Sequence, residues 1–212
     1  QHEDLVLRRG GDVADRGTIM RRAERTLAAC LGILLASTGC ATHGGGRTTF
    51  HDPKMDFSLV RSVAVLPFAN LTTTAKAEER VRDVFMTMLQ ATGAIYVLPP
   101  GEVARGISRA SLPNPLAPTA EEVVRLAKNL DVDVVITGSV LEYGEVRSAS
   151  ATANVVSVSA QMLEGQTGRV VWSTSATRGG IGAGKRIFGG GGEPMNVVTA
   201  KAVKDLLDRL FE

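Results

Sequence analysis

The sequence predicts one α/β domain, a single-domain sandwich in which helices pack on a mixed sheet. Its 212 residues, of which 44% are hydrophobic, suffice for one core of ordinary size. Residues 62–68 and 132–143 are apolar, β-branched runs typical of buried strands. Apolar residues recur at helical spacing between these runs and alternate with polar ones after them. The expected order is therefore β-α-β-α-α-β-β-β-α.

Each element has its own signal in the sequence. The helix over 75–92 stops at Gly93, and Thr119 and Glu122 fit a capping box that starts the helix after a proline-rich loop. Serine and valine alternate over 156–162, as in a half-exposed antiparallel strand, and Pro194 precedes the last amphipathic helix. In chain order we expect a strand at 62–68, helix 75–92, strand 95–98, helix 102–109, helix 119–130, strand 132–143, strand 156–162, strand 169–177 and helix 194–210.

The N-terminal part is expected to be a targeting segment. We expect residues 1–19 to precede the true start at Met20, 20–39 to be a signal peptide, 40–56 a lipidated tether and 57–212 the domain. Residues 26–39 carry no charge and follow a basic cluster. As a helix they would span about 20 Å, short of a hydrocarbon core of about 30 Å. The alternatives are a signal anchor and a buried core helix.

Cys40 is the expected site of lipid attachment. The segment from Leu35 to Cys40 resembles a bacterial lipoprotein signal, with Ser37 where leucine is usual. Several acyl chains, palmitate among them, would anchor Cys40 stably in a bilayer. Ala41 in place of aspartate resembles lipoproteins that are sorted to the outer membrane and face the periplasm. The alternative is a nucleophilic cysteine, but no histidine in the domain stands ready to activate it.

Composition excludes several function classes. A formal charge of +2 and only six Phe, two Tyr and one Trp argue against a nucleic-acid partner. All three histidines lie within the first 51 residues, and neither His nor Cys follows. A Ser-His-Asp triad, a Cys-His pair and a His- or Cys-ligated zinc site are thus excluded in cis. We expect no cofactor, no metal and no enzymatic activity.

One glycine-rich segment resembles a sequence motif found in enzymes. Gly179 to Lys185 has the spacing of a phosphate-binding loop, but Arg186 replaces the Ser or Thr that binds magnesium, and more glycines follow instead of a helix. A nucleotide enzyme or hydrolase that uses Lys185 is therefore the weaker interpretation. The stronger one is a mobile loop over Gly179–Gly192 with Phe188 facing a partner, so that Lys185, Arg186 and Phe188 are candidate interface residues.

The remaining candidates have structural alternatives. Trp172 is expected on a hairpin strand, with Val170 on its face, either as packing or as a subunit or membrane contact. Asn70 begins a glycosylation sequon, which we interpret as a loop with side-chain capping. Four carboxylates that flank a strand form a possible acid/base pair or are merely solvated: Asp131, Asp133, Glu142 and Glu145.

Three segments together resemble the family of the curli-secretion lipoprotein CsgG, whose relatives include PelC, LpoB and the amino-terminal domain of TolB. They are Val63–Asn70, Asp133–Val140 and Met162–Trp172. The resemblance covers roughly residues 60–211. It implies an anticodon-binding-like fold, no catalytic residues and frequent self-assembly at the outer membrane.

Three functions remain open at this point, the weakest of which is the nucleotide enzyme or hydrolase that uses Lys185. The first is a non-enzymatic outer-membrane lipoprotein whose domain forms homo-oligomers as an accessory of an export or envelope-assembly complex. The second is a binding module that regulates a peptidoglycan synthase, as the penicillin-binding-protein activator in the same family does.

Overall fold

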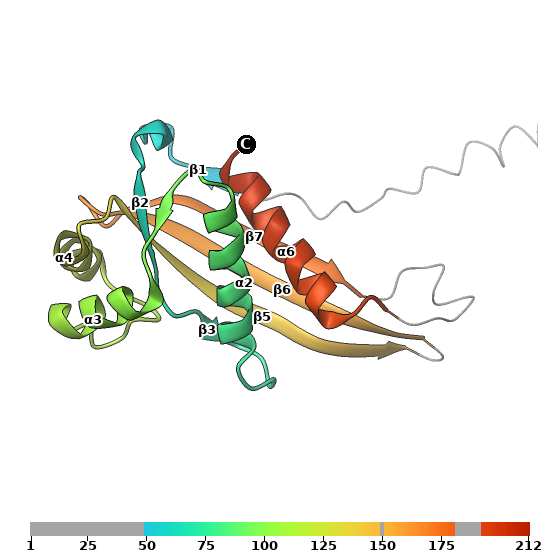
Figure 1. The fold of residues 1–212 in the computed structure, drawn as a ribbon. Coiled ribbons are helices and arrows are strands. Elements are labelled where there is room, and N and C mark those ends of the chain that lie inside the picture. The colour runs from blue at the N-terminus through green and yellow to red at the C-terminus, as the bar shows by residue number, and fades with distance from the viewer. Residues whose placement is uncertain (1–48, 149–150, 181–191) are drawn as a thin grey trace, which may run out of the picture. The chain divides into compact units, whose positions relative to one another are not determined.

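The computed structural model describes residues 49–148, 151–180 and 192–212, which form a mixed sheet of seven strands with helices on both faces (Figure 1). The strand order is β1-β7-β6-β5-β2-β4, and β3 pairs with β5 beside this path. Strands β2, β3 and β4 run parallel to their neighbours, whereas β5, β6, β7 and β1 form antiparallel pairs. The predicted mixed α/β class is confirmed.

The elements follow the predicted order, with three short additions: β1, the 3-10 helix η1 and β3. Their bounds are β1 Thr49–His51, η1 Phe57–Leu59, β2 Ser62–Val65, β3 Ala69–Asn70, α2 Ala77–Ala91, β4 Tyr96–Val97, α3 Pro100–Ala110, α4 Ala120–Leu130, β5 Val134–Ser148, β6 Ala151–Glu164, β7 Val170–Gly179 and α6 Met195–Leu210.

Strand β1 lies within the range expected to be tether. Residues Thr49–His51 pair with β7, and the buried carboxylate of Asp52 binds the guanidinium of Arg169. A three-residue edge strand is too short to show an alternating pattern, which is why the sequence did not reveal it. Residues 49–52, which lie inside the range expected to be tether, therefore belong to the fold.

One face of the sheet is covered by α2 and α6, and the main core lies between these two helices and the sheet. Val81, Phe85 and Leu89 of α2 and Leu206 of α6 are fully buried against β2, β5, β6 and β7. Burying each such side chain stabilises the fold by about 1.5–3 kcal/mol. These helical residues are the ones that the 3.6-residue spacing predicted.

The opposite face is covered by α3 and α4 at the β2 end only. Leu126 of α4 packs on Leu66 and Val135. The predicted capping box is present, since the Thr119 hydroxyl accepts from the Glu122 amide and the Glu122 carboxylate accepts from the Thr119 amide. On this face the second core covers only the start of β5 and the end of β6, and the described helices leave most of the remaining length of β5, β6 and β7 uncovered.

Strands β5 and β6 form a hairpin that is longer than predicted. Their pairing runs from Val134 opposite Glu164 to Ser148 opposite Ala151, with an irregularity after Val140. The prediction ended the first strand at 143 and began the second at 156, because small and polar residues hide the alternation between these points. The pairing of β7 also shifts near its start, so Val170 is exposed while Trp172 is buried. The prediction that Val170 lies on the same face as Trp172 is therefore wrong.

Candidate functional site

Several predicted site residues lie outside the part of the chain that the structure describes. These are Cys40, Lys185, Arg186 and Phe188. The ends of the glycine-rich segment are described, and both are held by Asn154 of β6. The Gly180 amide donates to the Asn154 carbonyl at 2.9 Å. The side-chain amide of Asn154 donates to the Glu193 carbonyl at 2.8 Å. Whatever path the segment takes, it starts and finishes beside one residue.

Trp172 is a core residue of the subunit. Its side chain is 0% exposed, and the indole N–H donates to the Arg209 carbonyl near the end of α6 at 3.1 Å. Of the two interpretations of Trp172, this geometry supports packing in the core. In this conformation the indole cannot contact a partner.

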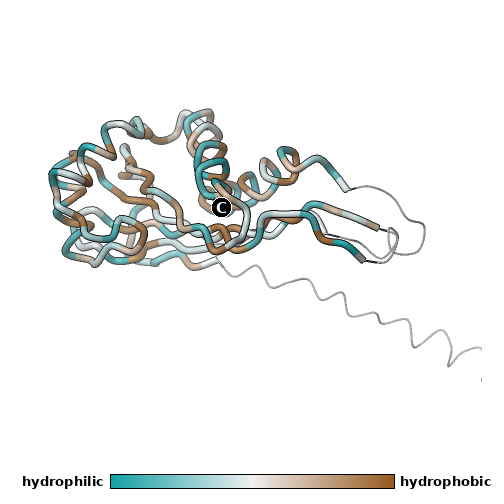
Figure 2. The backbone as a smooth tube through the Cα atoms, turned by 90° about the horizontal axis from the view of Figure 1, so that it is seen from below, coloured by the Kyte–Doolittle hydropathy of each residue, from teal (hydrophilic) through white to brown (hydrophobic). Residues whose placement is uncertain are grey.

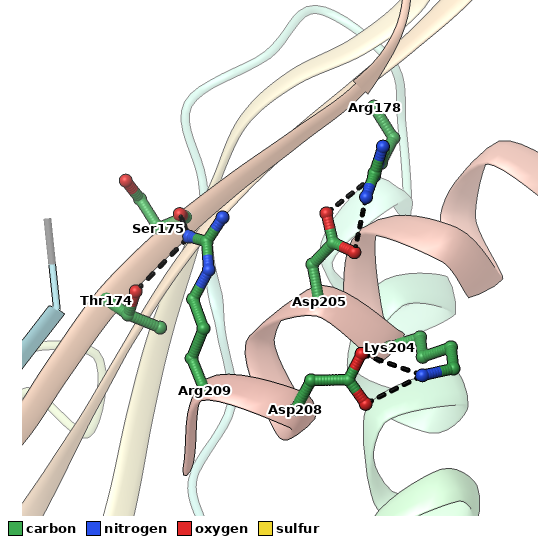
Figure 3. A network of polar contacts seen from close by, with 7 residues as sticks. All are labelled: Thr174, Ser175, Arg178, Lys204, Asp205, Asp208 and Arg209. Atoms are coloured by element: carbon green, nitrogen blue, oxygen red, sulfur yellow. Dashed lines mark hydrogen bonds and ion pairs between the residues drawn. The ribbon is translucent and has the colours of Figure 1, made fainter. Parts of the chain in front are cut away.

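A polar network fastens α6 to β7 around this tryptophan (Figure 3). Arg178 makes a bidentate pair with Asp205, with distances of 2.5 and 2.7 Å, and its hydrogen bond to that carboxylate raises the pKa of Arg178. The Arg209 guanidinium donates to the Ser175 carbonyl and lies 3.4 Å from the Thr174 hydroxyl. These contacts fix the helix on the sheet and leave no free acid or base.

The four predicted carboxylates are not brought together. Asp133 lies just before β5 and Glu142 nine residues further, so about 30 Å of extended chain separates them. Glu145 pairs with Arg147 at 2.6 Å on the exposed hairpin. Asp131 and Asp133 both line one groove, but the Asp133 carboxylate accepts hydrogen bonds from Arg61 and Ser62, so the pair is not arranged as a free acid and base. Within the described ranges, no group of three or more His, Cys, Asp or Glu could hold a metal ion.

Asp133 instead has a structural role that the sequence did not reveal. Its carboxylate accepts from the Arg61 amide at 2.8 Å, the Ser62 amide at 3.0 Å and the Ser62 hydroxyl at 3.1 Å. Burial raises the pKa of Asp133, but these hydrogen bonds together outweigh it, and the net pKa is lowered. Asp133 thereby joins the start of β2 to the start of β5.

Asn70 caps its own loop. Its side-chain amide donates to the Thr74 carbonyl, and its oxygen accepts from the amide and hydroxyl of Thr72. The expectation of local side-chain capping is confirmed.

Three hollows lie on the described surface. A groove of about 710 Å³ runs between η1, the end of α4 and the β6–β7 turn, with Met55, Val60 and Val132 on its walls and Lys54 and Lys128 among its charged lining residues. A second, of about 330 Å³, lies beside Arg82, whose pKa is lowered by burial. A third, of about 310 Å³, separates the loop at Leu116–Pro118 from the sheet.

The third hollow belongs to a surface that carries no charge, which we call the neutral face. Figure 2 shows the helices of the main core on one side of the long strands, and most of the other side has no described helix on it. The neutral face comprises the loop Ser111–Pro118 and seven sheet residues on the side opposite α2 and α6: Phe50, Thr137, Ser139, Ser159, Gln161, Ser173 and Ser175. The next row along the strands carries a charge, because exposed Glu142 pairs with Ser157. Sequence reasoning missed the neutral face, although residues 148–163 and 170–177 are long runs without Asp, Glu, Lys or Arg.

The described residues contain no helix with the length and apolar character needed to cross a membrane.

Comparison with known proteins gives a family match and a fold match. The model of the GNA1162-like lipoprotein family matches residues 54–210. The structure is similar to the PelC dodecamer from Paraburkholderia phytofirmans, with 18% identity, a TM-score of 0.51 and coverage of 77% of this chain and 94% of that one. It is also similar to lipoprotein GNA1162 from Neisseria meningitidis, with 17% identity, a TM-score of 0.51 and coverage of 71% and 98%. Among curated proteins, none matches this chain.

Proposed function

The chain belongs to the GNA1162-like lipoprotein family, and we propose that it is a non-enzymatic lipoprotein, anchored through Cys40 to the outer membrane and facing the periplasm. In this proposal residues 20–39 are removed as a signal peptide and the domain assembles into a homo-oligomer. The assembly serves as an accessory of an export or envelope-assembly complex.

The observation that carries the proposal is the short distance along the chain between Cys40 and β1. Only residues 41–48 lie between the proposed lipid site and the first residue of the sheet. Even fully extended, this stretch spans only about 30 Å. A lipid on Cys40 would therefore keep the domain beside its own membrane, where an accessory of a membrane export complex has to be.

The proposed assembly has separate support. PelC, which shares this fold over most of its length, forms a dodecamer. The neutral face also lacks the charged side chains that normally cover a surface in contact with water. Depletion of charge is typical of the centre of protein interfaces.

Lipid anchoring is tested with the two cysteines of the chain, because each serves as the control for the other. We expect cells fed a palmitate analogue to label the wild type and Cys30→Ser equally, and Cys40→Ser not at all. After sucrose-gradient separation of the membranes, the first two proteins should lie with the outer membrane and Cys40→Ser should be soluble. Unchanged labelling and membrane retention of Cys40→Ser would refute the anchor.

The partner is tested by cross-linking in intact cells followed by purification of the chain from the envelope. Recovery of export-complex proteins together with multimers of the chain supports the proposal. Recovery of a peptidoglycan synthase as the main partner would replace it with a regulatory role.

A further inference from the structure

We draw no further inference here: the strongest candidate, the hollow beside Arg82 that Glu78, Glu79 and Asp83 of α2 line, is a cluster of acidic side chains in which one carboxylate oxygen of Glu78 is buried without a hydrogen-bond partner, but the Glu78 side chain as a whole is only half-buried and no second observation among the described residues points to a ligand.

Discussion

Replacing Trp172 tests whether one indole holds α6 against the sheet. The side chain is fully buried among residues of β6, β7 and α6, and its N–H satisfies the Arg209 carbonyl in the last turn of the helix. Trp172→Phe removes the hydrogen bond and part of the volume. Trp172→Ala removes nearly all of the packing as well.

The expected loss can be worked out for each variant. For phenylalanine, the missing hydrogen bond is worth about 1 kcal/mol and the unfilled volume of roughly 40 Å³ about another 1 kcal/mol. Trp172→Phe should therefore lower the free energy of unfolding by about 2 kcal/mol. For alanine the range is about 3–5 kcal/mol. In a domain of this size these losses correspond to about 4–8 °C and about 6–20 °C in Tm.

Urea and thermal unfolding followed by far-ultraviolet circular dichroism measure both values, on the chain that begins at residue 41. Phe211→Ala is the control, because this aromatic follows α6 and is about half exposed. It should cost less than 1 kcal/mol. If Trp172→Ala lost no more stability than Phe211→Ala, the role assigned to the indole would be refuted.

Three further changes have defined outcomes. Asp133→Asn should lower the free energy of unfolding by about 1–2 kcal/mol at pH 7. Because the folded state lowers the pKa of Asp133, this difference should be full at neutral pH and shrink as the pH falls through that pKa, in urea titrations between pH 7 and 3. Gly168→Ala should cost more than about 2 kcal/mol in the same assay, since φ is +70° and the new Cβ would lie 2.3 Å from the Ala120 carbonyl oxygen; a loss below 0.5 kcal/mol would contradict this. A double-mutant cycle of Arg178→Gln and Asp205→Asn should give a coupling energy of about 0.5–1.5 kcal/mol, and additive losses would show that the pair contributes nothing.

Local signals predicted the elements well. The capping box at Thr119, the stop at Gly93 and the buried stripe of α6 depend on neighbours within a few residues, so their effect can be derived from spacing alone. The same holds for the Asn70 loop. The order of strands and helices was correct for this reason.

Contacts between distant segments could not be predicted in this way. Asp133 binds the chain more than 70 residues earlier, and β1 pairs among the described strands with β7, far along the chain, where Thr49 lies opposite Thr174. The neutral face exists only once β5, β6, β7 and β1 are aligned in register. Its uncharged runs are visible in the sequence, but which of their residues share a surface depends on pairing that spacing does not determine.

Strand β1 also has a mechanical consequence. It is the point at which tension applied through the preceding residues would enter the fold, and it offers only three paired residues as resistance. Pulled away from the sheet, it should open from Thr49, where its hydroxyl meets that of Thr174 at 2.9 Å, and halt at the ion pair between buried Asp52 and Arg169. That opening lengthens the chain by only about 10 Å. In single-molecule pulling we therefore expect a small first extension step at a lower force than the one that ruptures the sheet. Detachment of β1 would relieve the tension while the rest of the domain stays folded.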